Sequence, residues 1–425
     1  MTSTRHHGLN PPPLTRIAVV GAGFGGVYAF KKLHSLFHGK RHVELVLINK
    51  EKTFLFTPLL HEVATGGMSG ENVVEPLRKL FRCCSKSIVI AQVKSISCKK
   101  QTIETTAGDI PFDYCILAPG SQTNFFNTPG AEKQCFTLKT QSDALQIKKH
   151  FIELCERAVH EKDEKELEAM MRTVIIGGGA TGVELAAETA EYVYDTFPKY
   201  YRHTSFLKKA SIVLVHRGKE LIPQFCPQLR KRALSILRKK GVDVRLETAV
   251  KAVREGHVEL SSGEKLYNRT AIWVAGVAPV HLECENDLPY TSTSHLPVNE
   301  CLQVTESQNI YVIGDAALCT DEKGCPIPGL AQSAVQQGGA AALNIYNAIQ
   351  GKPLKKFIYK SRGSLLSLGQ GMAIAEIGKL HFSGSVAWFV WRTVYFFKLL
   401  SWDHQVKVGI DWFLDIFRPR DITDI

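Results

Sequence analysis

Two glycine-rich turns, each set between an apolar run and a helical pattern, constrain the fold of this 425-residue chain more than any other feature. The first turn follows Ile17-Ala18-Val19-Val20, reads Gly21-Ala22-Gly23-Phe24-Gly25-Gly26 and is followed by a second apolar run, Val43 to Ile48. This order predicts a dinucleotide-binding unit, because the turn lets the backbone approach a pyrophosphate and the helix N-terminus offers it unpaired N–H groups.

The same pattern returns in the middle of the chain. Thr173-Val174-Ile175-Ile176 leads into Gly177-Gly178-Gly179-Ala180-Thr181-Gly182, and a helix over Val183–Tyr194 and a strand over Ile212–Val215 follow. One such motif is weak evidence, since a tight strand-to-helix turn needs no ligand, but two copies in the same context are improbable by chance. The duplication predicts an α/β fold with two Rossmann-like domains and two bound dinucleotides.

The segments around the two copies indicate the order of the domains. A charged helical stretch, Asp143–Met171, connects the copies, and short strands are expected at Val242–Leu246, His257–Leu260 and Thr270–Gly276. A strand over Asn309–Ala317 and a helix over Gly329–Ile349 then predict a return to the first domain. We expect a first domain at 16–142 and 290–350, an inserted second domain at 143–289, a C-terminal region at 351–425 and a disordered lead-in at 1–15.

Composition narrows the class of protein. A hydrophobic content of 44% allows a sizeable core, and the net charge of +11 suits either nucleic acid or an anionic membrane surface. We expect no nucleic-acid partner, because no basic and aromatic patch occurs outside the C-terminus. Eleven cysteines are too sparse for a disulfide scaffold and no signal peptide opens the chain, so a reduced, cytosol-facing protein is expected.

The residues that end the second strand of each unit bear on cofactor choice. A carboxylate there reads the ribose of FAD or NAD, but this chain has Asn49, followed by Lys50, in the first copy. The second copy has His216 and Arg217, which would not repel a 2′-phosphate, although they are equally compatible with a solvated strand end. Preference between NADH and NADPH stays open.

Cysteine placement indicates where electrons leave a flavin held by one of the two sites. Disulfide reductases of this architecture carry C-x-x-x-x-C soon after the first turn, but Thr53–Glu75 contains no cysteine. The adjacent pair Cys83 and Cys84, in an expected helix, cannot easily form a functional disulfide and is interpreted as structural. The flavin should therefore reduce a bound acceptor directly, and no metal site is predicted.

The C-terminal region suggests that this acceptor lies in a membrane. Trp388, Trp391, Tyr395 and Trp402 recur at near-helical spacing, interleaved with Arg392 and Lys398, and a second segment, Val406–Phe417, continues the pattern with Trp412 and Phe413. No run reaches the roughly 18 apolar residues of a spanning helix, so we expect helices lying in a lipid interface. A dimerisation or core-covering helix pair is the alternative. A membrane acceptor for a flavin without thiols is most naturally a quinone.

Taken together, these motifs resemble the type II NADH:quinone oxidoreductases, which belong to the superfamily of flavoproteins with two dinucleotide-binding domains. The resemblance extends from Ile17 to the C-terminus and rests on Phe54-Leu55-Phe56-Thr57-Pro58-Leu59-Leu60-His61-Glu62-Val63-Ala64-Thr65-Gly66, Ala118-Pro119-Gly120-Ser121, Gly314-Asp315 and Ala331-Gln332-x-Ala334-x-Gln336-Gln337. It implies tightly but non-covalently bound FAD at the first turn, NADH at the second, and transfer of two electrons to quinone without proton pumping.

The resemblance also implies roles for particular residues. Gln332 and Gln336 would lie at the flavin and quinone pocket, Glu184 near the nicotinamide, and Lys360 near the quinone tunnel. Simpler accounts are a helix-capping glutamate for Glu184 and an exposed charge for Lys360. The residues expected to bind the cofactors are Gly21, Gly23, Phe24, Gly26, Asn49, Lys50, Thr57, Pro58, Ala118, Gly120, Gly177, Gly179, Ala180, Thr181, Gly182, His216, Arg217, Ala275, Gly276, Gly314, Asp315, Ala331 and Gln332.

Two other functions remain open from the sequence. A sulfide:quinone oxidoreductase would need cysteines beside the flavin, for which Cys135, Cys319 and Cys325 are candidates. A flavoprotein similar to apoptosis-inducing factor would bind NADH with little turnover. We expect a peripheral protein on the cytoplasmic face of a bacterial inner membrane, with a mitochondrial inner membrane and a homodimer as further alternatives.

Overall fold

The computed structural model describes residues 14–202, 205–284, 288–305, 307–415 and 420–423. The chain forms two compact units. The described parts of Met1–Phe54, Pro76–Gln122 and Ala278–Ser361 make the first unit, and those of Leu55–Glu75, Thr123–Val277 and Arg362–Ile425 make the second. Residues 55–75 and 123–142 were expected in the first domain and lie in the second unit. Residues 278–284, 288 and 289, expected in the second domain, and 351–361, expected in the C-terminal region, lie in the first unit. The predicted lead-in lies outside the described residues, except for Leu14 and Thr15, where strand β1 begins.

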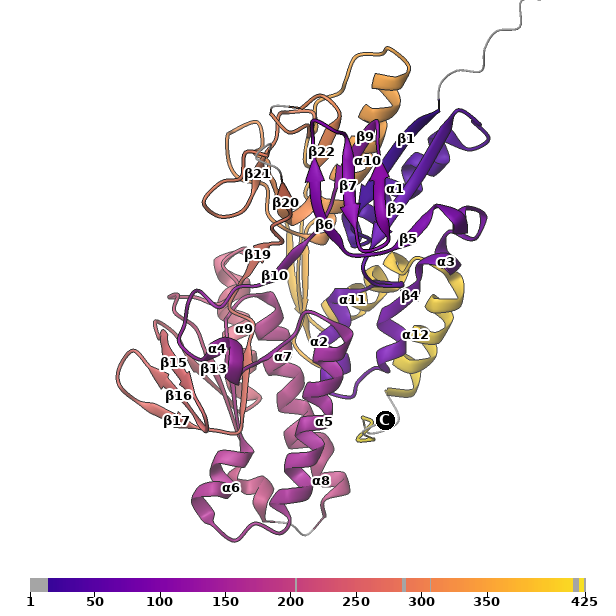
Figure 1. Cartoon of the computed structure of the whole chain (residues 1–425). Coiled ribbons are helices and arrows are strands. Elements are labelled where there is room, and N and C mark those ends of the chain that lie inside the picture. The colour runs from indigo at the N-terminus through magenta and orange to yellow at the C-terminus, as the bar shows by residue number, and fades with distance from the viewer. Residues whose placement is uncertain (1–13, 203–204, 285–287, 306, 416–419, 424–425) are drawn as a thin grey trace, which may run out of the picture. The chain divides into compact units, whose positions relative to one another are not determined.

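The first unit is built on a five-stranded sheet in the order β22-β9-β1-β2-β5, in which every pair is parallel. The apolar runs of the sequence form its centre, and Ile17, Ala18 and Val19 are fully buried. Helices α1 and α10 pack against each other beside this sheet (Figure 1). The bounds are β1 Thr15–Val20, α1 Phe24–Phe37, β2 Val43–Asn49, α3 Leu77–Leu80, η3 Arg82–Ser87, β5 Ile88–Ile90, β9 Tyr114–Leu117, β22 Ile310–Val312, η6 Gly314–Ala316 and α10 Ala331–Ile349.

The predicted return of the chain to the first domain is confirmed, because β22 pairs with β9 from Ile310 opposite Cys115 to Val312 opposite Leu117. A smaller sheet, in the order β20-β6-β7-β8, shares a core with the parallel sheet through Ile96 and Ile103. The remaining strands of this unit are β6 Val93–Ser97, β7 Thr102–Thr105, β8 Gly108–Pro111, β20 Glu283–Cys284, β21 Leu296–Pro297 and β23 Ala317–Leu318. Strands β3 Thr53–Leu55 and β10 Ser121–Thr123 end at the limits of the unit, and β19 Val277–Pro279 begins there.

The second unit repeats the pattern with the parallel sheet β11-β18-β12-β13-β14. Strand β12 pairs with β13 from Arg172 opposite Ser211 to Ile176 opposite Val215, as β1 pairs with β2. The bounds are β11 Phe136–Thr137, β12 Arg172–Ile176, α7 Ala180–Glu191, β13 Ser211–Val215, α9 Pro227–Lys239, β14 Val242–Arg245 and β18 Thr270–Trp273, with an antiparallel sheet of β15 Val250–Arg254, β16 His257–Leu260 and β17 Lys265–Tyr267. The predicted fold of two Rossmann-like domains is therefore confirmed.

The stretch Asp143–Met171, expected as one helix, forms two: α5 Gln141–Ala158 and α6 Glu164–Met171. Each helix has its own N-terminal cap. Thr140 and Asp143 make a reciprocal capping box, and the Asp163 side chain accepts from the Lys165 N–H. Because a capping residue has non-helical backbone angles, Asp163 ends any continuous helix through this point.

The other elements of the second unit come from its N-terminal, central and C-terminal segments. They are η1 Thr57–Leu59, α2 Leu60–Ala64, η2 Gly70–Val73, β4 Val74–Pro76, α4 Ala131–Gln134, η4 Tyr192–Thr196, α8 Phe197–Tyr200, η5 Phe206–Lys209, β24 Ser364–Ser367, β25 Ala373–Ile377, β26 Leu380–Gly384, α11 Ser385–Lys398 and α12 Trp402–Asp415. Among the described residues, no helix combines the length and the apolar character needed to cross a bilayer.

Candidate functional site

The glycines of the first turn differ in whether a side chain could be added at their positions. A Cβ on Gly21 would stand 2.2 Å from the Ala118 carbonyl oxygen, and one on Gly26 would stand 1.8 Å from the Gly21 carbonyl oxygen. At Gly23, the N-cap of α1, a Cβ would meet nothing within 4 Å. Strand, turn and helix are therefore packed tightly on one side and open at the helix N-terminus, which fits a pyrophosphate.

The second turn has the same geometry. A Cβ on Gly177 would lie 2.6 Å from Ala275 Cα, and one on Gly182 would lie 1.8 Å from the Gly177 carbonyl oxygen. At Gly179, the N-cap of α7, a Cβ would again meet no atom within 4 Å. Ala180 and Thr181 form the first turn of α7, where backbone N–H groups are free of intrahelical partners.

The two residues that replace the expected ribose-binding acids both hold their own glycine turn. Asn49 Oδ1 accepts a hydrogen bond of 2.9 Å from the Ala22 N–H, and His216 Nδ1 accepts one of 3.2 Å from the Gly178 N–H. Burial lowers the pKa of His216, and a neutral ring is what an accepting nitrogen requires. Both side chains therefore act on the turn itself.

Arg217 has different surroundings from His216. Its guanidinium lies 5.5 Å from the centre of the Phe126 ring, and it is exposed. A Cβ on Gly276 would stand 2.6 Å from the same ring, so Gly276, Phe126 and Arg217 form one surface beside the second turn. This surface is cationic and lacks a carboxylate among these three residues.

Asp315 lies at the start of η6, where Ser121 and Gln337 hold it and its neighbour Gly314; the sequence predicted no role for either of these two residues. The Ser121 hydroxyl donates to Asp315 Oδ2, and the neighbouring Gly314 N–H donates to Gln337 Oε1 at 2.7 Å. Gln337 is 2% exposed on the inner face of α10. The sequence feature that could have indicated this role is a second glutamine directly after Gln336, in a helix whose neighbouring residues are mostly alanine and glycine.

Gln336 and Lys360 are brought together through the backbone of Lys360. Gln336 Nε2 donates to the Lys360 carbonyl at 3.0 Å, and the Lys360 N–H donates to Gln336 Oε1 at 3.1 Å. The Lys360 side chain is exposed. Gln332 lies one turn earlier, where its carbonyl accepts from Gln336 Nε2 at 3.3 Å.

Two asparagines on α10 continue this attachment. Asn344 exchanges two hydrogen bonds with Lys355, of 2.9 and 2.8 Å, and Asn347 Nδ2 donates to the Pro353 carbonyl at 3.3 Å. We call residues 352–361, which have no regular secondary structure, the tether. The α10 helix thus holds the tether with side-chain amides along its length.

Glu184 lies in the second unit, one turn into α7, among groups that oppose its ionisation. Burial, with smaller contributions from Glu188 and Glu62, raises the pKa of Glu184 to about 8, although its Oε1 accepts a 3.2 Å hydrogen bond from the Ser367 N–H. Its Oε2 lies 3.9 Å from His61 Nδ1. Since burial and then Arg420 lower the pKa of His61 to about 3, this contact joins a neutral imidazole to a protonated carboxyl, despite its ion-pair distance.

His61, on α2, was quoted in the motif but not assigned a role. Its side chain is 3% exposed, and its Nε2 has no hydrogen-bond partner among the described residues. The pKa of Tyr395 is also raised, by burial and by Glu184. The second unit therefore places one neutral imidazole, that of His61, and one phenol, that of Tyr395, near the protonated carboxyl of Glu184.

The face of α7 beyond Glu184 is neutralised by the C-terminal segment. Arg420 donates to Glu188 Oε2 at 2.5 Å, to Glu191 Oε2 at 2.6 Å and to Thr65 Oγ1 at 3.1 Å. Lys240 also pairs with Glu191. Each of these side chains is less than a quarter exposed, so the network compensates charges that are largely removed from water.

Other predicted cofactor residues are placed as follows. Phe24 packs edge-on against Phe54 with ring centres 5.1 Å apart, and Lys50 is exposed after β2. Gly120 has φ +75 and open space at its Cβ position. Thr57 and Pro58 open η1 and belong to the second unit, whereas the first glycine turn belongs to the first.

The predicted aromatic stripe needs correction at Trp391 and Tyr395 on α11, whereas Trp402, the first residue of α12, is exposed as predicted. Trp391 is fully buried, and Tyr395 packs edge-on against Phe56. The Arg392 guanidinium lies 4.1 Å from the Trp388 ring centre and 5.1 Å from that of Trp412. These side chains face the protein because aromatic rings of this size also fill the core between helices.

A set of apolar side chains that shares Trp402 and Phe413 with the prediction is exposed on α11 and α12, at helical spacing. We call it the apolar face: Val386, Phe389, Phe397, Trp402, Val406, Ile410 and Phe413, each at least 41% exposed. The last of the residues named for this region, Phe417, lies outside the described part of the chain.

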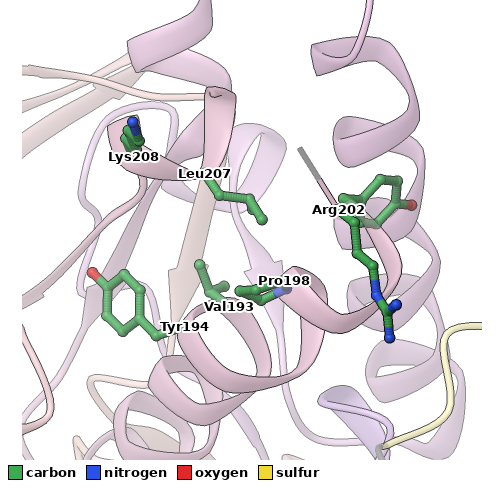
Figure 2. A pocket seen from close by; sticks show the side chains of 7 residues that line it. Val193, Tyr194, Pro198, Arg202, Leu207 and Lys208 are labelled. Carbon is green, nitrogen blue, oxygen red and sulfur yellow. The ribbon is translucent and has the colours of Figure 1, made fainter. Parts of the chain in front are cut away.

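A surface hollow of about 280 Å³ lies elsewhere in the second unit, between α8, η4 and η5 (Figure 2). Its lining residues are Val193, Tyr194, Pro198, Tyr201, Arg202, Leu207 and Lys208. No glycine-turn residue and no other predicted site residue lines it, so it has no part in the candidate site.

Comparisons with known proteins place this geometry in context. Residues 15–338 match the family model "Pyridine nucleotide-disulphide oxidoreductase", and residues 361–421 match "NDH2 C-terminal domain". The demethylphylloquinone reductase of Synechocystis is 30% identical over 93% of this chain and 95% of its own length. A type II NADH:quinone oxidoreductase of Mycobacterium tuberculosis is 29% identical, with 93% and 86% covered. The structure of NDH2 from Plasmodium falciparum in complex with NADH has a similar fold, with a TM-score of 0.87, 22% identity, and 96% of this chain and 99% of that chain covered.

Proposed function

Because the chain belongs to the pyridine nucleotide-disulphide oxidoreductase family and ends in an NDH2 C-terminal domain, we propose that it acts as a type II NADH:quinone oxidoreductase. Bound FAD would accept hydride from NADH and pass two electrons to a membrane quinone, without proton pumping. The observation that carries this proposal is the pair of equivalent glycine turns, each packed tightly behind and open at a helix N-terminus.

The first unit fits FAD. The open position at Gly23 lets the helix N-terminus approach a pyrophosphate, and Asn49 fixes the turn through the Ala22 N–H. Asp315, oriented by Ser121 and by the Gln337-bound backbone of Gly314, offers a carboxylate to hydroxyl groups of the ribityl chain. Ala331 and Gln332 begin α10, whose N-terminal dipole favours negative charge on a bound flavin.

The second unit would hold the nicotinamide dinucleotide at Gly177–Gly182. His216 supports this turn through its Nδ1. Arg217, stacked on Phe126 and exposed, can meet either ribose hydroxyls or a 2′-phosphate. We propose NADH as the main donor and NADPH as a usable one.

Reduction of a quinone also consumes two protons, and Glu184 is the residue we propose to deliver one. Its pKa of about 8 keeps it protonated at neutral pH. His61, 3.9 Å away and neutral, is placed to return a proton to it from the partnerless Nε2 side. Gln332 is proposed to contact the flavin and the quinone. Gln336 and the Lys360 backbone are proposed to shape that pocket by holding the tether.

Sulfide:quinone oxidoreductase is the weaker alternative. Its chemistry needs reactive thiolates, but burial raises the pKa of Cys135 to about 12 and also raises the pKa of Cys319. Cys325 is exposed on the loop that follows Cys319. All eleven cysteines are free, which agrees with a reducing compartment.

We also propose that the apolar face binds a lipid surface, which makes the protein peripheral to the cytoplasmic face of a bacterial inner membrane or to a mitochondrial inner membrane. Seven large apolar side chains exposed on two adjacent helices are more than scattered surface hydrophobics explain, and Lys407 lies among them. A homodimer would be the rival use of this face.

Co-sedimentation with anionic vesicles should fall about tenfold or more for Phe389→Ser with Phe413→Ser. It should be unchanged for Leu380→Ser, which removes an equally exposed side chain from β26. A loss of dimer instead of vesicle binding would favour the rival.

The main test is anaerobic stopped-flow mixing of the flavin-loaded protein with NADH, or separately with NADPH, followed by a short-chain quinone. We expect rapid bleaching of the flavin and recovery on quinone addition. Bleaching without recovery would instead indicate a non-respiratory NADH-binding flavoprotein, and no bleaching with either nucleotide followed by reduction with sulfide would indicate the thiol-dependent enzyme.

A further inference from the structure

We propose that the first unit carries a zinc-binding site formed by His34, Cys83 and Cys84, apart from the dinucleotide sites. His34 lies on α1, and the two cysteines lie on the short turn η3. Among the described residues, His34 Nε2 or Nδ1, Cys83 Sγ and Cys84 Sγ form one of two groups whose potential ligand atoms all lie within 4.8 Å of one another. Two thiols and an imidazole are the donor set that Zn²⁺ prefers.

Two of the three separations between these atoms match edges of a zinc tetrahedron, and the third, from Cys84 Sγ to the His34 ring nitrogen, is within 4.8 Å. Cys83 Sγ lies 3.7 Å from Cys84 Sγ and 3.4 Å from His34 Nε2. With Zn–S of about 2.3 Å and Zn–N of about 2.0 Å, tetrahedral coordination separates two sulfurs by about 3.8 Å and a sulfur from a nitrogen by about 3.5 Å. One ion could therefore be bound with little movement of the three side chains.

Buried packing supports this arrangement in addition to the contacts between the ligand atoms. Phe30 precedes His34 by one helical turn, and Phe81 precedes η3. Their rings meet at 72° with centres 4.9 Å apart, and both are buried. The Cys84 N–H donates to the Phe81 carbonyl at 2.9 Å. The aromatic pair thus fixes η3 against α1 at the level of His34, so the site is organised before any ion arrives.

The site is accessible to an ion from solvent. Cys83 is exposed, and His34 and Cys84 are partly so. His38 follows His34 by four residues, with ring centres 5.1 Å apart, and water or the exposed His38 ring would complete the tetrahedron. On binding, each thiol releases its proton to water, and two thiolates balance the charge of Zn²⁺.

The second group, Cys226, Glu376 and His381 in the second unit, is a poorer candidate. It offers one thiol only, and Glu376 Oε2 already accepts the Cys226 N–H at 2.8 Å. It provides an internal control, because zinc bound there would respond to Cys226 and not to Cys83.

The test titrates Zn²⁺ into full-length, flavin-loaded, reduced and metal-free protein against a chromophoric zinc indicator. We expect one tight equivalent. Cys83→Ser, Cys84→Ser and His34→Gln should each weaken it at least about 100-fold, since even partners outside the coordination shell are worth about 10- to 100-fold. Cys226→Ser and Cys301→Ser should leave the affinity unchanged. Flavin content and NADH oxidation without zinc should match the parent protein in every variant, which shows that the fold is intact.

A second measurement needs no variant. One equivalent of Zn²⁺ should protect Cys83 and Cys84, but not Cys325, from alkylation, and Co²⁺ should give a thiolate charge-transfer band. The proposal would be overturned by the absence of a tight equivalent, by an equivalent that survives both serine variants, or by one lost in Cys226→Ser. A Cys83–Cys84 disulfide that persists in reductant would overturn it as well.

Discussion

Glu184 is neutral at pH 7 because it is buried beside two other carboxylates, and this should be visible in the pH dependence of turnover. As pH rises through about 8, the residue loses its proton and quinone reduction should slow. Glu184→Gln cannot supply a proton, so we expect turnover to fall about 100-fold and the limb near this pH to disappear. Steady-state rates from pH 6 to 10 measure this. Glu166→Gln, which breaks a surface pair with Arg269, should keep the parent profile.

The same carboxyl should affect stability with a defined sign. The folded state keeps a proton that the unfolded chain releases above its ordinary pKa of 4.5, so stability should fall as pH rises from there to about 8. In Glu184→Gln this part of the pH dependence should vanish in denaturant titrations. A variant with an unchanged slope would show that the group titrates normally.

Substitution of Gln337 tests the contribution of an uncharged side chain to the position of Asp315. Gln337→Leu leaves the partly buried Gly314 N–H without its 2.7 Å acceptor, which should cost about 1–3 kcal/mol and loosen Asp315. We expect a lower denaturation midpoint and faster loss of flavin on dilution. Gln146→Leu, on an exposed position of α5, should change neither. Normal flavin retention in Gln337→Leu would mean that Asp315 is positioned by Ser121 alone.

At the scale of an element, one face of α7 carries Glu184, Glu188 and Glu191 at helical spacing, and Arg420 compensates two of them. Arg420→Met should therefore destabilise the second unit by about 3–5 kcal/mol, because it leaves buried carboxylates without their cation. Adding Glu188→Gln should recover much of the loss, since Lys240 still pairs with Glu191. Thermal unfolding of the three proteins checks this. Equal destabilisation of the single and double variants would contradict a charge-based role.

The elements themselves were largely predictable, and the contacts between distant segments were not. Glycine turns between apolar runs indicate β1, α1, β12 and α7 because local spacing decides them. The break at Asp163 was missed because a charged helical period continues through it. The roles of His61 and Arg420 could not be foreseen, since each depends on partners far along the chain. Part of the aromatic stripe was assigned to the wrong face: Trp391 and Trp412 are buried, whereas Trp402 and Phe413 are exposed as predicted, because residue type alone does not distinguish a lipid-facing ring from a core ring.

For the whole molecule, the duplication allows the two nucleotide sites to be disabled separately. An added methyl at Gly182 or at Gly26 would stand 1.8 Å from a backbone oxygen in its own turn. We expect Gly182→Ala to keep its flavin but to lose bleaching by NADH, while dithionite-reduced flavin still reduces quinone. Gly26→Ala should lose flavin, as the absorbance of the purified protein would show. Gly339→Ala, a helical glycine with open space, is the matched control. Loss of flavin in Gly182→Ala would mean that the halves do not work independently.

The way α10 holds the tether also determines how this region should respond to salt, pH and prolonged heating. The tether is hydrogen-bonded by the side-chain amides of Gln336, Asn344 and Asn347. These amides have no charge that salt could screen or that a change of pH could remove. Amides are, however, among the groups that heat hydrolyses, so their conversion to carboxylates would replace donors by acceptors opposite backbone carbonyls. The attachment of the tether should therefore be insensitive to salt and pH, but prolonged heating should weaken it irreversibly through deamidation.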